Sequence, residues 1–157
     1  MIVASLPALE PDLSFVYLPH SEQAFEFTFA AKKEALGPHI RSRWAWEENY
    51  QRDVHRARFS EKVFFSILQD GVPIGTLSWM IFADHARFGE FYLLNAYQQK
   101  GIGTRVLKHI VEQADRHRLG IRLEYLKWNP VGRLYLRHDF RPTQETENHV
   151  FLERAAR

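Results

Sequence analysis

The chain has 157 residues, of which 45% are hydrophobic and 25% are charged, as is typical of one globular domain. It contains no cysteine, which excludes disulfides, thiolate catalysis and cysteine-ligated metal. The formal net charge of +2 is too small to indicate nucleic-acid binding, and no apolar run approaches the ~20 residues that cross a bilayer. We therefore expect a single domain over residues 1–157, with neither nucleic acid nor membrane as a partner.

The first residues of the chain bear on its location. Residues 1–11 are mildly apolar but lack a basic start and a convincing cleavage site, so we expect no signal peptide. A cytoplasmic location is the resulting expectation. The sequence does not fix the oligomeric state, a homodimer being one option.

The first third of the chain predicts one strand and two helices. Residues 13–18 (LSFVYL) form a β-rich run. Ser21 is a candidate N-cap for a helix, which we expect to end near Leu36 because Gly37-Pro38 follows. A second helical stretch covers about residues 42–58.

The middle of the chain predicts three strands and a helix. The strands correspond to β-rich runs over residues 62–68, 74–82 and 87–94. Asp70-Gly71 between the first two is a hairpin signal. A turn with two glycines then leads into an amphipathic helix, which extends to about His117 and is followed by Leu119-Gly120.

The last third predicts a strand, a short helix and two closing strands. Residues 121–128 alternate as a strand, and Asn129-Pro130 opens a helix that ends near His138. The closing strands lie near residues 140–142 and 149–153. This order predicts a mixed α/β fold, in which helices cover a largely antiparallel sheet with a parallel pair in the middle.

The turn Gln98–Thr104 carries the main indication of chemistry. The first turn of a helix leaves backbone N–H groups without partners, at the positive end of the helix dipole, where a phosphate binds well. Gly101 and Gly103 lack the Cβ that would hold such an anion away, and Lys100 and Arg105 add positive charge. By itself this pattern also fits a plain tight turn. Neither a P-loop nor a Rossmann fingerprint is present.

Two motifs together resemble the GNAT N-acetyltransferase superfamily. Residues 98–103 (QQKGIG) match its Q/R-x-x-G-x-G/A signature, and the preceding residues 91–97 (FYLLNAY) resemble its fourth strand. Residues 129–140 (NPVGRLYLRHDF) resemble its N-x-x-A-x-x-x-Y-x-[KR]-x-G-F segment. Asn95 replaces a usual proline and Asp139 a usual glycine, although aspartate tolerates the left-handed backbone. The resemblance covers about residues 62–153.

The resemblance implies a GNAT-like fold and a bound cosubstrate, acetyl-CoA. The fold would have a mostly antiparallel sheet of six to seven strands and about four helices. The fourth strand would pair with the pantetheine arm, the turn amides would hold the pyrophosphate, and an asparagine would touch the cofactor near the last helix. The implied cofactor-binding residues are Leu93, Leu94, Asn95, Gln98, Gln99, Lys100, Gly101, Ile102, Gly103, Thr104, Arg105 and Asn129.

The resemblance also implies catalytic roles. Tyr135 matches the tyrosine that often protonates the departing CoA thiolate, although it also fits a packing role between helix and sheet. For the general base that deprotonates the amine, Glu90 is the first candidate and Glu47 the second. Each also fits a plain surface or structural carboxylate. Asp84 and His85 fit a surface turn better than a catalytic site.

The expected activity is transfer of an acetyl group from acetyl-CoA directly to a primary amine of a small molecule or peptide. A non-catalytic acyl-CoA sensor and an enzyme for longer acyl groups remain alternatives. Three aromatic residues, Trp44, Trp46 and Tyr50, fit either an acceptor wall or core packing. The eight histidines show no metal-binding spacing, so we expect no metal.

Overall fold

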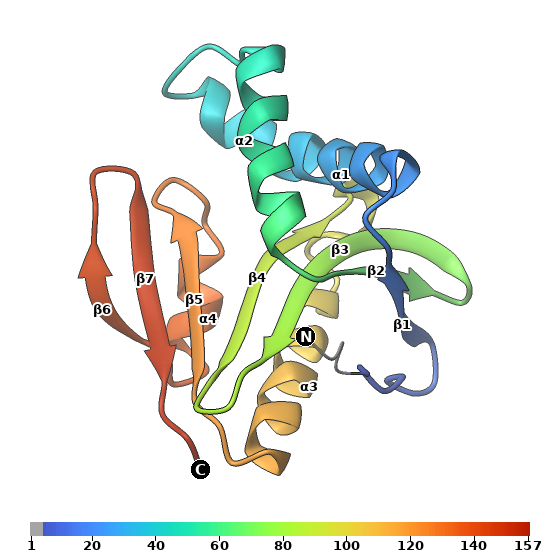
Figure 1. Ribbon diagram of the computed structural model, residues 1–157, viewed down its shortest axis with the longest axis vertical. Coiled ribbons are helices and arrows are strands. Elements are labelled where there is room, and N and C mark those ends of the chain that lie inside the picture. The colour runs from blue at the N-terminus through green and yellow to red at the C-terminus, as the bar shows by residue number, and fades with distance from the viewer. Residues whose placement is uncertain (1–4) are drawn as a thin grey trace.

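The computed structural model describes residues 5–157 (Figure 1). Residues 1–4 lie outside the described residues. They belong to the N-terminal stretch for which we expect no signal peptide. The elements follow in the order β1 (Leu13–Leu18), α1 (Glu22–Arg41), α2 (Glu48–Glu61), β2 (Phe64–Gln69), β3 (Val72–Ile81), β4 (Ala86–Leu93), a 3-10 turn (Asn95–Tyr97), α3 (Ile102–Arg116), β5 (Ile121–Leu126), α4 (Gly132–Leu136), β6 (Arg141–Glu145) and β7 (His149–Arg154).

The strands form one mixed, mostly antiparallel sheet, as predicted. Within residues 5–157 it has seven strands in the order β1-β2-β3-β4-β5-β7-β6, and β4 with β5 is its parallel pair. Four α-helices flank it. The predicted fold class is therefore confirmed.

The helices divide between the two faces of the sheet. Successive residues of a strand point to opposite faces, and Phe64 and Phe65 of β2 belong to two different apolar clusters. Phe65 packs in the large cluster that contains Leu107 of α3 and Tyr135 of α4. Phe64 packs in the smaller cluster with Phe25 of α1, which α2 completes. Helices α1 and α2 thus cover one face, and α3 and α4 cover the other.

Strands β4 and β5 pair over a short stretch only. The parallel register joins Ala86 to Ile121 and Arg87 to Arg122. Beyond these pairs the two strands diverge, as Figure 1 shows. The divergence leaves the carboxyl ends of β4 and β5 without a shared ladder, and α1 lies across this end.

Helix α1 continues past the glycine-proline pair, so the expectation that it ends near Leu36 is wrong. It runs to Arg41 with Pro38 inside it. A residue before proline normally avoids the helical region because its Cβ meets the proline ring, and Gly37 has no Cβ. Ser21 does cap the helix as predicted, since its Oγ accepts a hydrogen bond from the Ala24 amide at 3.1 Å.

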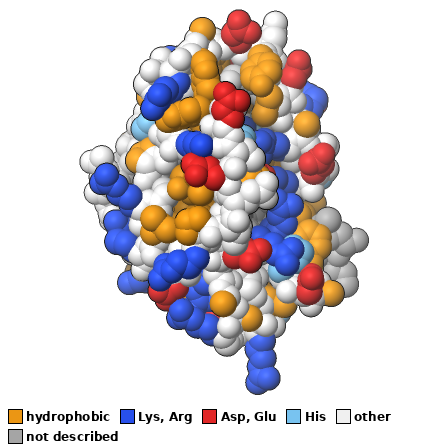
Figure 2. Space-filling view, turned by 90° about the vertical axis from the view of Figure 1, so that its left-hand side faces the viewer, with side chains coloured by type: hydrophobic (Ala, Val, Ile, Leu, Met, Phe, Trp, Pro, Cys, Tyr) orange, Lys and Arg blue, Asp and Glu red, His pale blue; other side chains and the backbone are white. Residues whose placement is uncertain are grey.

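The surface carries charges of both signs. In Figure 2 acidic and basic side chains are interspersed with apolar ones on the face shown. Among residues 5–157, no helix has both the length and the hydropathy that a bilayer span requires.

Candidate functional site

Two cavities meet at the carboxyl end of β4. One, of about 360 Å³, lies between that end and the first turn of α3, and we call it the α3 cavity. The other, of about 530 Å³, lies between helices α1 and α2 and strands β4 and β5, and we call it the α1–α2 cavity. Tyr92 of β4 lines both of them. Tyr92 thus forms part of the wall of both cavities, so a ligand in either one would lie against this tyrosine.

The first turn of α3 supplies unpaired donors to the α3 cavity. Gly101 caps the helix with a φ of 80°, and Gln99 before it has a φ of 59°, so the chain enters the helix through left-handed backbone. Within the described chain, none of the amides of residues 99–104 donates a hydrogen bond to a backbone carbonyl. Unpaired amides at a helix start are the donors that a phosphate accepts.

The same cavity has room at its glycine. A Cβ built at Gly103 would meet nothing closer than 3.8 Å, and the atoms it meets belong to Leu134 and Phe91, which line the cavity. Arg137 and His39 lie on its walls and bring cationic or hydrogen-bonding groups. Donor amides, an arginine and open space suit the diphosphate of a cofactor such as coenzyme A.

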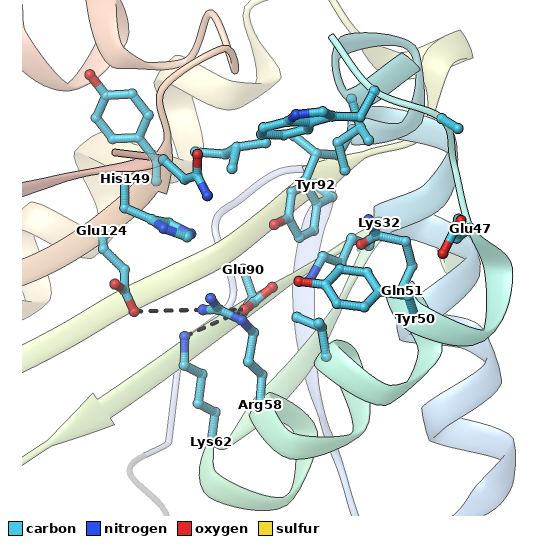
Figure 3. Close-up of a pocket in the computed structure, with 18 residues that line it drawn as sticks. Lys32, Glu47, Tyr50, Gln51, Arg58, Lys62, Glu90, Tyr92, Glu124 and His149 are labelled. Atoms are coloured by element: carbon cyan, nitrogen blue, oxygen red, sulfur yellow. Dashed lines mark hydrogen bonds and ion pairs between the residues drawn. The ribbon is translucent and has the colours of Figure 1, made fainter. Parts of the chain in front are cut away.

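The α1–α2 cavity has an apolar wall and a charged floor (Figure 3). The apolar wall consists of Leu36, Ile40, Trp44, Ala45, Tyr50, Val54 and Leu126. The charged floor consists of Lys32, Arg58, Lys62, Glu90 and Glu124. Such a cavity suits a molecule that has an apolar body and an ionic end.

Glu90 is brought into the floor by an irregularity of β4. The β3–β4 register shifts between Thr76 and Ser78, and Glu90 has a φ of 45°. A bulge of this kind bends a strand and redirects a side chain. The Glu90 carboxylate is buried, with Oε1 lying 3.4 Å from Lys62 Nζ and 3.7 Å from an Arg58 guanidinium nitrogen.

The charge state of Glu90 follows from these neighbours. Burial alone would raise the pKa of its carboxyl, but the positive charges of Lys32, Lys62 and Arg58 outweigh burial and lower the pKa to about 2. Glu90 is therefore ionised at neutral pH. Its second oxygen, Oε2, is buried and has no hydrogen-bond partner in the described chain.

A family model settles the class of this protein. Residues 60–142, more than half of the chain, match the model described as "Acetyltransferase (GNAT) domain". The chain belongs to the GNAT acetyltransferase family. The resemblance in the sequence is thereby confirmed.

Solved structures share the GNAT fold with this chain. The PaiA N-acetyltransferase from Thermoplasma acidophilum, in complex with coenzyme A, has a TM-score of 0.67 at 20% identity over 90% of this chain and 99% of that one. PH1933 from Pyrococcus horikoshii has a TM-score of 0.69 at 16% identity, over 92% and 99%. The ribosomal-protein-S18-alanine N-acetyltransferase from Escherichia coli has a TM-score of 0.62 at 14% identity, over 90% and 92%. Comparison with the curated proteins finds no match.

Seven of the twelve predicted cofactor-binding residues line the α3 cavity of this GNAT domain. They are Leu93, Gln98, Gln99, Gly101, Gly103, Thr104 and Asn129. The side chains of two of them have structural partners. Gln98 Nε2 donates to the Leu93 carbonyl at 2.9 Å, and Asn129 Oδ1 accepts from the Val131 amide at 3.1 Å. These bonds fix the end of β4 and the start of the α4 segment.

The other five predicted residues, Leu94, Asn95, Lys100, Ile102 and Arg105, do not line either cavity. Ile102 packs in the main core, so only its amide faces the turn. Arg105 turns to Asp12, with nitrogen–oxygen distances of 2.7 and 3.2 Å. Its guanidinium is thus engaged in a partly buried ion pair. The cofactor role of these five remains a prediction.

Asn95 has a local explanation for replacing the family's proline. Its backbone amide donates to Glu34 Oε2 of α1 at 2.6 Å, a bond that proline would lack. The carboxylate of Glu34 thus ties the helix to the end of β4, next to both cavities.

Tyr135 lies in the core next to the site. It is 3% exposed, its ring packs against those of Tyr125, Phe88 and Phe140, and it does not line either cavity. Burial raises the pKa of the Tyr135 phenol, so the hydroxyl stays protonated at neutral pH. The Tyr135 ring packs against Tyr125, and Tyr125 in turn lines the α1–α2 cavity. Its catalytic role remains a prediction.

The remaining candidates divide between the cavity and the surface. Glu47, Trp44 and Tyr50 line the α1–α2 cavity. Trp46 does not, and its ring packs against Phe29. His85 and Asp84 pair with each other at 2.7 Å, outside both cavities.

Sequence reasoning missed several residues of the site. Tyr92 is one of them, although it lies inside the resembling segment, two residues after the candidate base Glu90. Lys32, Arg58 and Lys62 belong to elements far from the two motifs. No local pattern marks them, because the fold alone brings them to the floor.

Proposed function

We propose that this GNAT chain is an acetyl-CoA-dependent N-acetyltransferase that moves the acetyl group directly to a primary amine. The observation that supports this best is the meeting of the two cavities at Tyr92. On one side lie unpaired helix-start amides, and on the other lies the ionised Glu90. A phosphate-bearing thioester and an amine would thus be held with their reacting atoms close together.

The α3 cavity is the proposed cofactor site. The amides of residues 99–104 would hold the pyrophosphate, with Arg137 adding a positive charge. The end of β4 at Leu93 would lie beside the pantetheine arm. The coenzyme A complex of the PaiA N-acetyltransferase, which has the same fold, supports this choice of cofactor. When bound, acetyl-CoA supplies an acetyl group activated as a thioester.

Glu90 is the proposed group on the amine side. In the reaction the amine nitrogen forms a bond to the thioester carbonyl carbon, the carbon–sulfur bond breaks, and the nitrogen loses a proton. The Glu90 carboxylate would attract the amine, stabilise the positive charge that develops on its nitrogen and receive its proton. Because its pKa is about 2, Glu90 would hold that proton only briefly.

Tyr135 is the proposed group on the thiolate side. Breaking the carbon–sulfur bond places a negative charge on sulfur, which a phenol can neutralise by giving up its proton. Burial keeps the Tyr135 phenol protonated at neutral pH, and it also makes this phenol a weaker acid than a phenol in water. Its position behind Tyr125 requires the sulfur to approach through the divergence of β4 and β5.

The deciding experiment measures cofactor binding and turnover in one preparation. Acetyl-CoA binding is measured by calorimetry, and thiol release is then followed against a panel of amines. We expect binding together with amine-dependent release. Binding without release by any amine would favour the acyl-CoA sensor, and absence of binding would contradict the proposal.

A further inference from the structure

Lys32 is a buried cation at the floor of the α1–α2 cavity. It lies on α1, is 5% exposed and points into the cavity toward Glu90 (Figure 3). No carboxylate of residues 5–157 lies within 4.0 Å of its ammonium nitrogen, and that nitrogen makes no hydrogen bond within this range. Burial lowers the pKa of the Lys32 ammonium, and an anion supplied by a ligand would stabilise its charged form.

The other cations of the floor already have partners. Lys62 and Arg58 lie 3.4 and 3.7 Å from Glu90, and Arg58 lies 3.6 Å from Glu124. Glu124 is shared further with Arg87 at 3.9 Å. Of the three floor cations, Lys32 is therefore the one with no carboxylate of residues 5–157 within 4.0 Å of its ammonium nitrogen.

An unpaired acceptor lies beside this unpaired cation. Glu90 Oε2 has no hydrogen-bond partner in the described part of the chain, and Glu90 lines the same cavity as Lys32. A ligand with an amine and a carboxylate on neighbouring atoms would satisfy both groups, the amine at Glu90 and the carboxylate at Lys32. Glu90 is two residues from Tyr92, where the two cavities meet, so such an amine would be the reacting one.

The remaining residues of the cavity indicate what kind of side chain the ligand would carry. Leu36, Trp44, Tyr50 and Val54 form an apolar wall above the floor. The volume of about 530 Å³ leaves room for a side chain of substantial size. An apolar or aromatic side chain would bury its surface there.

On these grounds we propose that the acceptor is an α-amino acid with an apolar side chain, and that Lys32 binds its carboxylate. This inference rests on the proposed acetyltransferase function and specifies its substrate class. Lys32 is a specificity-determining residue in this arrangement, since it contacts the acceptor away from the bond that forms.

The test uses two matched acetylated products that differ in one group. N-acetyl-L-phenylalanine carries the carboxylate, and N-acetylphenethylamine lacks it. Their binding to the full chain saturated with coenzyme A is measured by calorimetry at pH 7, without any turnover. We expect the carboxylate to improve affinity about tenfold or more, as for a charge-assisted hydrogen bond.

The variant Lys32→Met links this preference to the lysine. It removes the charge and keeps the length of the side chain, so we expect the preference to disappear while N-acetylphenethylamine binds as before. Lys32→Arg retains the charge and should retain most of the preference. The fold should survive, because the Lys32 ammonium makes no hydrogen bond and no ion pair within 4.0 Å in residues 5–157, and Lys32→Gln provides the same comparison if Lys32→Met does not fold.

Three results would overturn the inference. They are equal affinities for the two products, no detectable binding of either product, and a preference that Lys32→Met leaves intact. Coenzyme A binding in the same titrations separates this failure from that of the proposed function. If coenzyme A does not bind, the proposed function fails; if it binds and the preference is absent, only the acceptor class is wrong.

Discussion

Gly132 leaves the space that the hydroxyl of Tyr125 occupies. A Cβ at Gly132 would lie 2.4 Å from Tyr125 Oη and 2.7 Å from its Cζ, closer than real atoms approach. Gly132 begins α4, whereas Tyr125 on β5 lines the α1–α2 cavity. The family pattern has alanine at this position, so the glycine accompanies a bulky ring that faces the proposed acceptor.

We predict that Gly132→Ala is destabilising, because the ring and the added methyl group cannot both keep their places. Overpacking of this kind costs about 1–3 kcal/mol of unfolding free energy. Urea denaturation measures it. Gly89→Ala serves as the control, because a Cβ at Gly89 meets nothing within 4 Å. Adding Tyr125→Phe should restore part of the loss, and a Gly132→Ala variant as stable as the control would contradict the steric explanation.

At a second glycine, Gly103, a substitution should act on acetyl-CoA binding and not on stability. At Gly103 an added Cβ meets protein atoms only at 3.8 Å or beyond, and the glycine lies in the first turn of α3. Gly103→Ala should therefore leave the unfolding free energy unchanged or raise it by up to ~1 kcal/mol, since alanine favours helix. The family signature admits alanine at this position, so Gly103→Ala should also retain acetyl-CoA binding, whereas the indole of Gly103→Trp would fill the proposed pyrophosphate site and abolish binding in calorimetry. Unchanged affinity in Gly103→Trp would move the phosphate site elsewhere.

These two glycines illustrate what the sequence could predict. The turn at Gly101 and Gly103 is a local feature, because the helix start and its unpaired amides follow from a few adjacent residues. The mostly antiparallel sheet with a parallel pair likewise follows from strand and helix signals in chain order. The close approach of Tyr125 to Gly132 joins positions seven residues apart on different elements, so no local sequence pattern indicates it.

The floor of the α1–α2 cavity escaped prediction for a related reason. Glu90 was identified, but its neighbours Arg58 and Lys62 come from α2 and the segment after it, and Lys32 comes from α1. Their charges meet only because β4 bulges at Glu90 and the helices cross the same end of the sheet. The end of helix α1 was mispredicted for a local reason, because Gly37 permits Pro38 inside the helix.

The catalytic role of Tyr135 can be tested by substitution, with the stability of the variant protein as the control. Its hydroxyl makes no hydrogen bond within residues 5–157, so Tyr135→Phe should change the unfolding free energy by less than ~0.5 kcal/mol. If the phenol protonates the thiolate, kcat should fall at least about tenfold while the acetyl-CoA dissociation constant stays the same. Steady-state kinetics and calorimetry measure the two quantities. An unchanged kcat would reduce Tyr135 to a packing role.

The lowered pKa of Glu90 leads to a prediction about how kcat/KM depends on pH. Its pKa of about 2 means that the carboxylate is ionised throughout the range from pH 5 to pH 9. The dependence of kcat/KM on pH in this range should therefore reflect the acceptor amine and not Glu90. Glu90→Gln should lower kcat/KM for the amine and leave the shape of the profile unchanged. If the wild-type profile has an inflection near pH 6 that Glu90→Gln abolishes, Glu90 titrates there and the cations do not hold it ionised.

His55 should make the fold sensitive to mild acid. It is fully buried between α1 and α2, and its Nε2 lies 2.8 Å from Thr28 Oγ1. The threonine hydroxyl already donates to the Phe25 carbonyl at 3.1 Å, so Nε2 carries the proton and donates to Thr28. Nδ1 is then an unprotonated nitrogen without a partner in the described chain. Burial, followed by the charge of Lys32, lowers the pKa of His55 from 6.5 to about 4.

The sign of the pH effect follows from that lowered pKa. Between pH 6.5 and pH 4 the unfolded chain binds a proton at His55 that the folded chain does not, so stability is complete above this window and declines as the pH falls through it. The loss from this group is on the order of 3 kcal/mol. His55→Gln, which keeps a donor toward Thr28, should flatten the decline in urea titrations at pH 7, 5.5 and 4. His117→Gln, an exposed position after α3, should retain the wild-type decline, and an equally steep decline in His55→Gln would assign the acid sensitivity to another group.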